Sequence, residues 1–271
     1  TEIYTLSLHD ALPIYIGGII GPLAGGLIGE NFNLRTVYYV SGVIFTISSL
    51  IILMAGDQKV LAHPKRKGEG HLLQNRQFLG MLVMILFVMT AVMLPQPLAA
   101  NFLQNQRGIS LSSIGQLGSL GALGSVIMML LLGHMQSGVA MLIGQVALMG
   151  YSALLWKGTG LIWYGLGYLF LGGYRLTRAM TVALVRPVVR EREVGLAFGL
   201  VESLNSLATV IAPVLAGVLY DWKPISIFPA SLIVLGVTFV LSLRYTHRKG
   251  YHRPMIVEME PALEKEITSE P

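Results

Sequence analysis

The feature of this sequence that most restricts its fold is a series of eight apolar stretches separated by polar connections. A helix that crosses the roughly 30 Å hydrocarbon core of a bilayer needs about 20 apolar residues. A transmembrane β-strand has only about ten residues, and their polarity alternates. The stretches cover residues 15–29, 36–54, 78–100, 113–133, 139–156, 161–185, 195–220 and 227–245. We therefore predict an all-α membrane protein, a polytopic helical bundle with eight transmembrane helices.

The composition agrees with a chain that lies mostly in a membrane. Charged residues make up 12% of the chain, about half of the usual quarter for soluble domains, and the mean hydropathy is +0.66. These values exclude a disordered protein and an ordinary soluble enzyme. The chain contains no cysteine, which excludes a disulfide scaffold and thiolate metal sites.

Lysine and arginine residues are distributed unevenly over the connections between the stretches. Alternate connections form two classes, one with thirteen of these residues and the other with four. Basic residues gather on the cytoplasmic side of membrane proteins. We therefore expect a plasma or inner membrane protein whose linker 55–77 and polar, disordered tail 246–271 are cytoplasmic. The run Lys65-Arg66-Lys67 could contact nucleic acid instead, but a topology signal explains it more simply, and no nucleic-acid partner is expected.

The first fourteen residues, 1–14, resemble one translated reading frame of a common sequencing-adapter oligonucleotide. We interpret them as a non-native segment and leave them out of the fold prediction. On this interpretation the first span begins at residue 15. Its 15 residues cover roughly 22 Å at 1.5 Å per residue, which is less than the membrane core requires.

An internal repeat relates the first span to the seventh. Residues 20–30 align without gaps with residues 211–221, which places Pro22 over Pro213. Six-helix parallel repeats are a transporter architecture. The repeat predicts an original twelve helices in two halves, with 15–54 as the last two helices of the first half and 78–245 as the second half. Chance similarity between spans rich in glycine and proline is the alternative.

The first span also contains the pattern G-x-x-x-G-P-x-x-G-G, formed by Gly17, Gly21, Pro22, Gly25 and Gly26. Three of its glycines are four residues apart, so they form a face that another backbone can approach closely. The fourth span carries a matching face of small residues, and we expect the two spans to pack, chiefly through Gly21 and Gly25. That face consists of Gly115, Gly118, Ser119, Ala122 and Ser125.

This glycine-proline pattern resembles the antiporter signature in the fifth helix of the drug:proton antiporters of the major facilitator superfamily. Residues 107–110, 115–124 and 195–203 are also similar to that family, so the resemblance covers about 15–245 as helices five to twelve. It implies that the pattern packs against the other half of a transporter and rearranges during alternating access. A static packing groove is the alternative.

Three ionisable residues lie inside predicted spans, where a charge costs about 2.5–3.5 kcal/mol on insertion scales. Arg175 and Arg178 lie in the sixth span, and Glu202 begins a polar stripe with Asn205 in the seventh. Counting from the span ends places Arg178 and Glu202 at similar depth on the cytoplasmic side. We expect Glu202 to pair with Arg178 or Arg175 and to take up a proton when the pair separates. Arginines that reach the interface, or a static ion pair, are the alternatives.

Gln96 is a further candidate for the cavity, because it lies near the outer end of the third span between Pro95 and Pro97. It could face a substrate. Equally, the two prolines could only shape the end of the helix.

These features predict a secondary active transporter, most simply a proton-coupled exporter of small molecules that works by alternating access. Its expected partners are the lipid bilayer, a small-molecule substrate and protons, and a monomer is expected at full length. A metabolite or sugar importer of the same superfamily, and a non-transporting membrane receptor or sensor, remain open. No span contains a histidine and no phosphate-binding loop is present, so neither an enzyme, a cofactor nor a metal site is expected.

Overall fold

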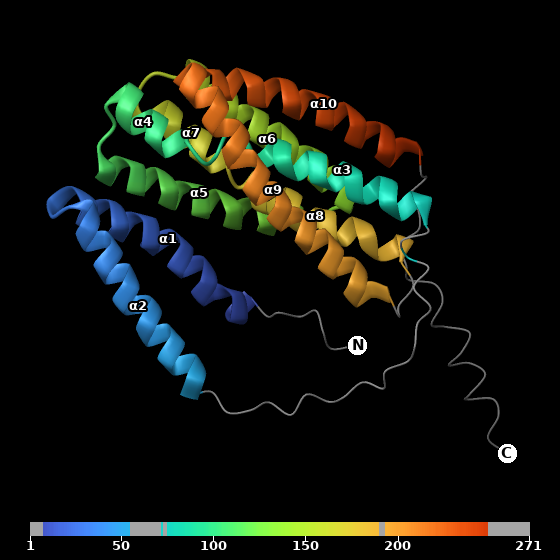
Figure 1. The fold of residues 1–271 in the computed structure, drawn as a ribbon, viewed down its shortest axis with the longest axis horizontal. Coiled ribbons are helices and arrows are strands. Elements are labelled where there is room, and N and C mark those ends of the chain that lie inside the picture. Colours follow the sequence, from blue (N-terminus) through green and yellow to red (C-terminus); the bar gives the residue numbers. More distant parts are fainter. Residues whose placement is uncertain (1–7, 55–71, 73–74, 190–192, 249–271) are drawn as a thin grey trace.

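The computed structural model describes residues 8–54, 72, 75–189 and 193–248, and every structural statement below concerns these residues. They form ten α-helices (Figure 1). Most of the linker 55–77 and of the tail 246–271 lies outside the described residues. The helices are α1 (Leu8–Asn31), α2 (Leu34–Met54), α3 (Arg76–Met93), α4 (Ala99–Arg107), α5 (Leu111–Leu132), α6 (Ser137–Lys157), α7 (Leu161–Phe170), α8 (Gly173–Val185), α9 (Val194–Trp222) and α10 (Ile227–Arg248).

The prediction of an all-α, polytopic bundle is confirmed. Six segments of the described chain are long and apolar enough to cross a membrane, namely α2, α3, α5, α6, α9 and residues 224–245. Within the predicted stretch 161–185 the structure has two helices, α7 and α8, and α4 begins only at the end of the predicted stretch 78–100.

The predicted single helix over 78–100 is wrong, because α3 ends at Met93 and α4 begins at Ala99. Pro95 and Pro97 lie in the gap, and proline removes a backbone donor and disfavours helical geometry in the residue before it. The Gln96 backbone N–H donates to the Met93 carbonyl at 3.1 Å, as part of the turn between the two helices.

The predicted single helix over 161–185 is also wrong, because α7 and α8 are separated at Leu171 and Gly172. Glycine has low helix propensity, and here two glycines, Gly172 and Gly173, are consecutive. Neither half is long enough to cross the bilayer alone, since α7 and α8 have 10 and 13 residues, or roughly 15 and 20 Å. Together they form one discontinuous span.

The first helix is longer than the predicted span. α1 begins at Leu8 and has 24 residues, or roughly 36 Å, so it is long enough to span the membrane core. The interpretation of 1–14 as a non-native segment stays a prediction, because helix formation does not reveal the origin of a sequence.

The helices from α3 to α10 share two apolar cores. One core is built from α3, α6, α8, α9 and α10, and it includes Ile85, Met141 and Leu148. The other lies around α4, α5, α6 and α7, where Phe102 makes an edge-to-face contact of 4.9 Å with Phe228 of α10. α1 and α2 lie to one side, with α1 along α5 (Figure 1), and no described residue of α2 is buried.

Candidate functional site

The first functional feature is the contact between α1 and α5, where two backbones touch. A Cβ atom on Gly115 would lie 2.5 Å from the Pro22 carbonyl oxygen and 2.9 Å from the Gly26 Cα, and one on Gly118 would lie 2.9 Å from the Pro22 Cβ. The small face of α5 permits this approach. The prediction that the first and fourth spans pack together is confirmed.

The predicted face of α1 is wrong, however. A Cβ atom on Gly17 or Gly21 would meet nothing within 4 Å, and one on Gly25 would meet only Val37 of α2, at 3.9 Å. Pro22 and Gly26 form the contact instead, together with Gly18, where an added Cβ atom would lie 3.9 Å from the Ala122 Cβ. The stripes 17/21/25 and 18/22/26 are adjacent on the helix, and the docking of α1 selects the second.

Two hydrogen bonds hold α1 to α5. The Ser119 hydroxyl donates to the Ile19 carbonyl oxygen at 2.5 Å, so a side chain from one helix satisfies the backbone of the other. At the end of α1, the Glu30 carboxylate accepts the backbone N–H of Ser112 at 2.6 Å. That N–H belongs to the first turn of α5, where backbone donors lack partners within the helix and where the helix dipole favours a negative charge.

A second backbone contact lies at the break between α7 and α8. A Cβ atom on Gly172 would lie 2.6 Å from the Ser125 nitrogen of α5. A Cβ atom on Gly144 of α6 would lie 2.8 Å from the Gly173 carbonyl oxygen. The break between α7 and α8 therefore lies between α5 and α6, and glycines permit the close approach on both sides. Sequence reasoning assigned Ser125 to the α1 face, whereas it lies at this junction.

The third feature is a charged cluster between α8 and α9. Arg178 of α8 forms a hydrogen-bonded ion pair with the Glu202 carboxylate of α9. The side-chain amide of Asn205 donates to the second oxygen of that carboxylate at 3.2 Å. Asn205 is 2% exposed, whereas the side chains of Arg178 and Glu202 are 43% and 50% exposed. Both residues of the pair therefore lie at the surface of the bundle with a buried polar group behind them.

The positions of the pair along their helices explain why it forms. Arg178 precedes the end of α8 by seven residues and Glu202 follows the start of α9 by eight, so both lie roughly 10–12 Å from the helix ends that face each other across the loop. The pairing with Arg178 is thus the one that the structure contains. Arg175 is exposed, and its side chain forms no hydrogen bond or ion pair with the described residues.

Gln96 uses its side-chain nitrogen locally. The amide donates to the Val92 carbonyl oxygen at 2.6 Å and so satisfies one of the last carbonyl groups of α3. This geometry favours the interpretation that the Pro95–Pro97 segment shapes the end of the helix. A contact between Gln96 and a substrate stays a prediction.

Broken helices, backbone contacts at glycines and a charged pair between apolar helices characterise a polytopic helical membrane protein. Residues 11–175 match the model of the Major Facilitator Superfamily, which is more than half of the sequence, and the chain belongs to this family. The predicted superfamily is therefore confirmed, and the drug:proton antiporter subtype stays a prediction. No curated protein sequence matches the chain.

Among solved structures, the chain is similar to the crystal structure of a bacterial homologue of the iron transporter ferroportin in an inward-facing state. The two share 16% sequence identity with a TM-score of 0.63, and the match covers 91% of this chain and 64% of that one. The chain thus spans just under two thirds of the length of that structure. At this identity the likeness concerns the fold.

Proposed function

We propose that the chain forms part of a secondary active transporter that exports small molecules in exchange for protons. Membership in the Major Facilitator Superfamily supports the transporter assignment. The discontinuous span formed by α7 and α8 supports it as well, because substrate sites in transporters are typically formed by discontinuous helices. In this proposal α1 to α10 correspond to family helices five to twelve.

The observation that carries the proton coupling is the Arg178–Glu202 pair. A charge inside an apolar span is costly unless it is paired, and here the carboxylate has Arg178 on one oxygen and Asn205 on the other. The pair joins two different helices, so a relative movement of α8 and α9 changes the surroundings of the carboxylate directly.

The proposed step is a proton exchange at the Glu202 carboxylate. While Arg178 is in contact, its guanidinium lies against one oxygen of the carboxylate. When α8 moves away from α9, the carboxylate loses the opposite charge of Arg178 and keeps the Asn205 amide. Glu202 then takes up a proton on one carboxylate oxygen and releases it when Arg178 returns. Proton binding and the arrangement of the two helices are therefore linked.

The α1–α5 crossing is the proposed sliding contact between the two halves. Backbones that touch at Gly26 and Gly115 have no interdigitating side chains there, so little repacking opposes a small shift. The open stripe Gly17, Gly21 and Gly25 is proposed to accept a neighbouring helix in the complete transporter. The linker and the C-terminus are proposed to be cytoplasmic.

The test uses the complete transporter in proteoliposomes with an imposed pH gradient and a panel of fluorescent amphiphilic dyes. Glu202→Gln is expected to abolish gradient-driven dye movement and to leave dye exchange without a gradient intact. Asp221→Asn is the control, because it removes a carboxylate from the opposite end of α9. Normal gradient-driven movement in the Glu202→Gln protein would remove Glu202 from the mechanism.

A static ion pair gives a different pattern. In that case Glu202→Gln lowers folded yield, and exchanging the two residues, Arg178→Glu with Glu202→Arg, restores both yield and transport. The proposal expects the exchanged pair to restore yield without gradient-driven transport, because the carboxylate then lies on the other helix.

A further inference from the structure

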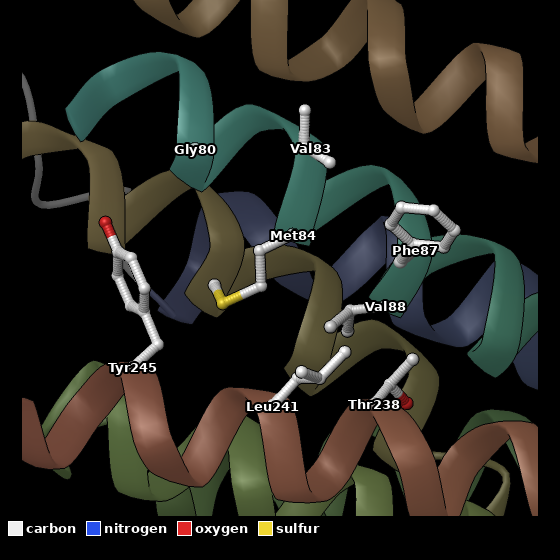
Figure 2. A pocket seen from close by; sticks show the side chains of 8 residues that line it. All are labelled: Gly80, Val83, Met84, Phe87, Val88, Thr238, Leu241 and Tyr245. Atoms are coloured by element: carbon white, nitrogen blue, oxygen red, sulfur yellow. The ribbon is translucent and has the colours of Figure 1, made fainter. Parts of the chain in front are cut away.

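An apolar groove of about 270 Å³ lies between α3 and α10, away from the charged cluster (Figure 2). Its lining residues are Gly80, Val83, Met84, Phe87, Val88, Thr238, Leu241 and Tyr245. Val83, Phe87 and Leu241 are 55%, 59% and 48% exposed, so the groove opens on the outer surface of the bundle. In a chain that spans a membrane, an exposed apolar surface of this kind is suited to contact with lipid.

The walls of the groove are carbon over most of their length. Thr238 is the hydroxyl-bearing residue deep in the groove, and its hydroxyl already donates to the Leu235 carbonyl oxygen at 3.1 Å, with the Gln145 side-chain oxygen 3.4 Å away. From Gly80 to Val88 the α3 wall is roughly 12 Å long. Tyr245 extends from α10 toward α3 at one end of the groove (Figure 2).

That same end carries two arginines. Arg76 lies one turn before Gly80 on α3, and Arg244 lies one turn after Leu241 on α10. The two helices run in opposite directions, so the start of α3 and the end of α10 lie at the same end of the bundle (Figure 1). Both arginines are exposed, and neither forms an ion pair within the described part of the chain.

We propose that this groove binds an anionic phospholipid, with one acyl chain along α3 between the two helices and the phosphate between Arg76 and Arg244. The apolar walls suit the acyl chain, and the two positive charges at the predicted cytoplasmic end suit the negatively charged headgroup. Basic sites between helices on this side of a membrane bind acidic lipid headgroups, and each arginine near the surface is worth about fivefold in affinity.

Native mass spectrometry of the purified 271-residue chain in detergent tests the proposal without requiring transport. The probes are phosphatidylglycerol and phosphatidylcholine with identical acyl chains, and inorganic phosphate as a competitor. The unmodified chain is expected to bind phosphatidylglycerol at least fivefold more tightly than phosphatidylcholine, and millimolar phosphate is expected not to displace it.

Two sets of variants distinguish the contribution of the lipid's acyl chain from that of its headgroup. Gly80→Leu fills the groove at a position with open space beyond the glycine, and it is expected to weaken the binding of both lipids. Gly236→Leu is the matched control, since it adds the same side chain into open space on the opposite side of α10. Arg76→Gln with Arg244→Gln is expected to reduce phosphatidylglycerol binding to the level of phosphatidylcholine, and the corresponding lysine pair is expected to retain the preference.

Three results would overturn the proposal. These are equal binding of the two lipids by the unmodified chain, binding by the Gly80→Leu variant equal to that of the Gly236→Leu variant, and displacement of the lipid by inorganic phosphate. The proposed transport function does not depend on any of them.

Discussion

A Cβ atom placed on Gly26 of α1 would lie 2.9 Å from the Cα of Gly115 in α5, and the reverse placement gives the same distance. The two backbones therefore touch at this point, and neither position has room for a side chain. One turn further along α5, the Ser119 hydroxyl binds the Ile19 carbonyl of α1. The attachment of α1 to the rest of the bundle thus depends on two residues that have hydrogen in place of a side chain.

We expect Gly26→Ala and Gly115→Ala each to destabilise the α1–α5 contact by about 1–3 kcal/mol, the usual cost of overpacking. Gly21→Ala is the control, because its added methyl group enters open space on the same helix and alanine favours a helix. Thermal unfolding in detergent, followed by the loss of monodisperse protein, measures the difference. Equal unfolding temperatures for all three variants would contradict the contact face.

The Arg178–Glu202 pair predicts that two arginines three residues apart behave differently. Arg178→Gln is expected to lower stability by about 0.2–1 kcal/mol, since both partners are about half exposed. Arg175→Gln is expected to have no effect, because Arg175 lacks a partner among the described residues. A double-mutant cycle with Glu202→Gln checks the assignment, and a coupling energy to Arg175 larger than that to Arg178 would reverse it.

The glycines at the α7–α8 break predict a second steric limit, separate from the one at the α1–α5 contact. Gly144→Ala in α6 is expected to cost about 1–3 kcal/mol, because the added methyl group would lie 2.8 Å from the Gly173 carbonyl oxygen. Gly199→Ala in α9 adds the same group into open space and is expected to be neutral. Denaturant titration of the two purified variants compares them. A tolerated Gly144→Ala would show that α6 and α8 do not approach this closely.

The charge distribution predicts the side of the membrane on which each connection lies. Because the chain has no cysteine, a single added cysteine reports its own position. An impermeant thiol reagent applied to intact cells is expected to label Gln106→Cys at the end of α4 and to leave Gly68→Cys in the linker unlabelled until the cells are opened. Labelling of Gly68→Cys in intact cells would invert the topology.

The helical class is a property that the local sequence determines. A stretch of about 20 apolar residues must satisfy its own backbone hydrogen bonds in a membrane, and only a helix does so within one segment. Depth along a helix is equally local, because each residue adds a fixed rise. Counting residues from the span ends therefore places Glu202 and Arg178 at similar depth.

Rotation about a helix axis is different, because it depends on the neighbouring helix. The stripes Gly17/Gly21/Gly25 and Gly18/Pro22/Gly26 both present small residues, so periodicity does not choose between them, and the docking against Gly115 and Gly118 does. In the same way Arg175 and Arg178 differ by less than one turn, and the crossing of α8 and α9 selects Arg178.

The two helix interruptions have different origins: the one after α3 is local, and the one between α7 and α8 depends on packing. Pro95 and Pro97 interrupt a helix through their own covalent structure. The sequence thus contains the reason why α3 ends, even though the prediction of a single span over 78–100 is wrong. Two glycines in an apolar span only weaken a helix. At the break, the backbone of Gly172 contacts that of Gly124 in α5, and the backbone of Gly173 contacts that of Gly144 in α6. Those close approaches join residues from about 30 to about 50 positions apart in the chain, and only the packing of the helices brings them together.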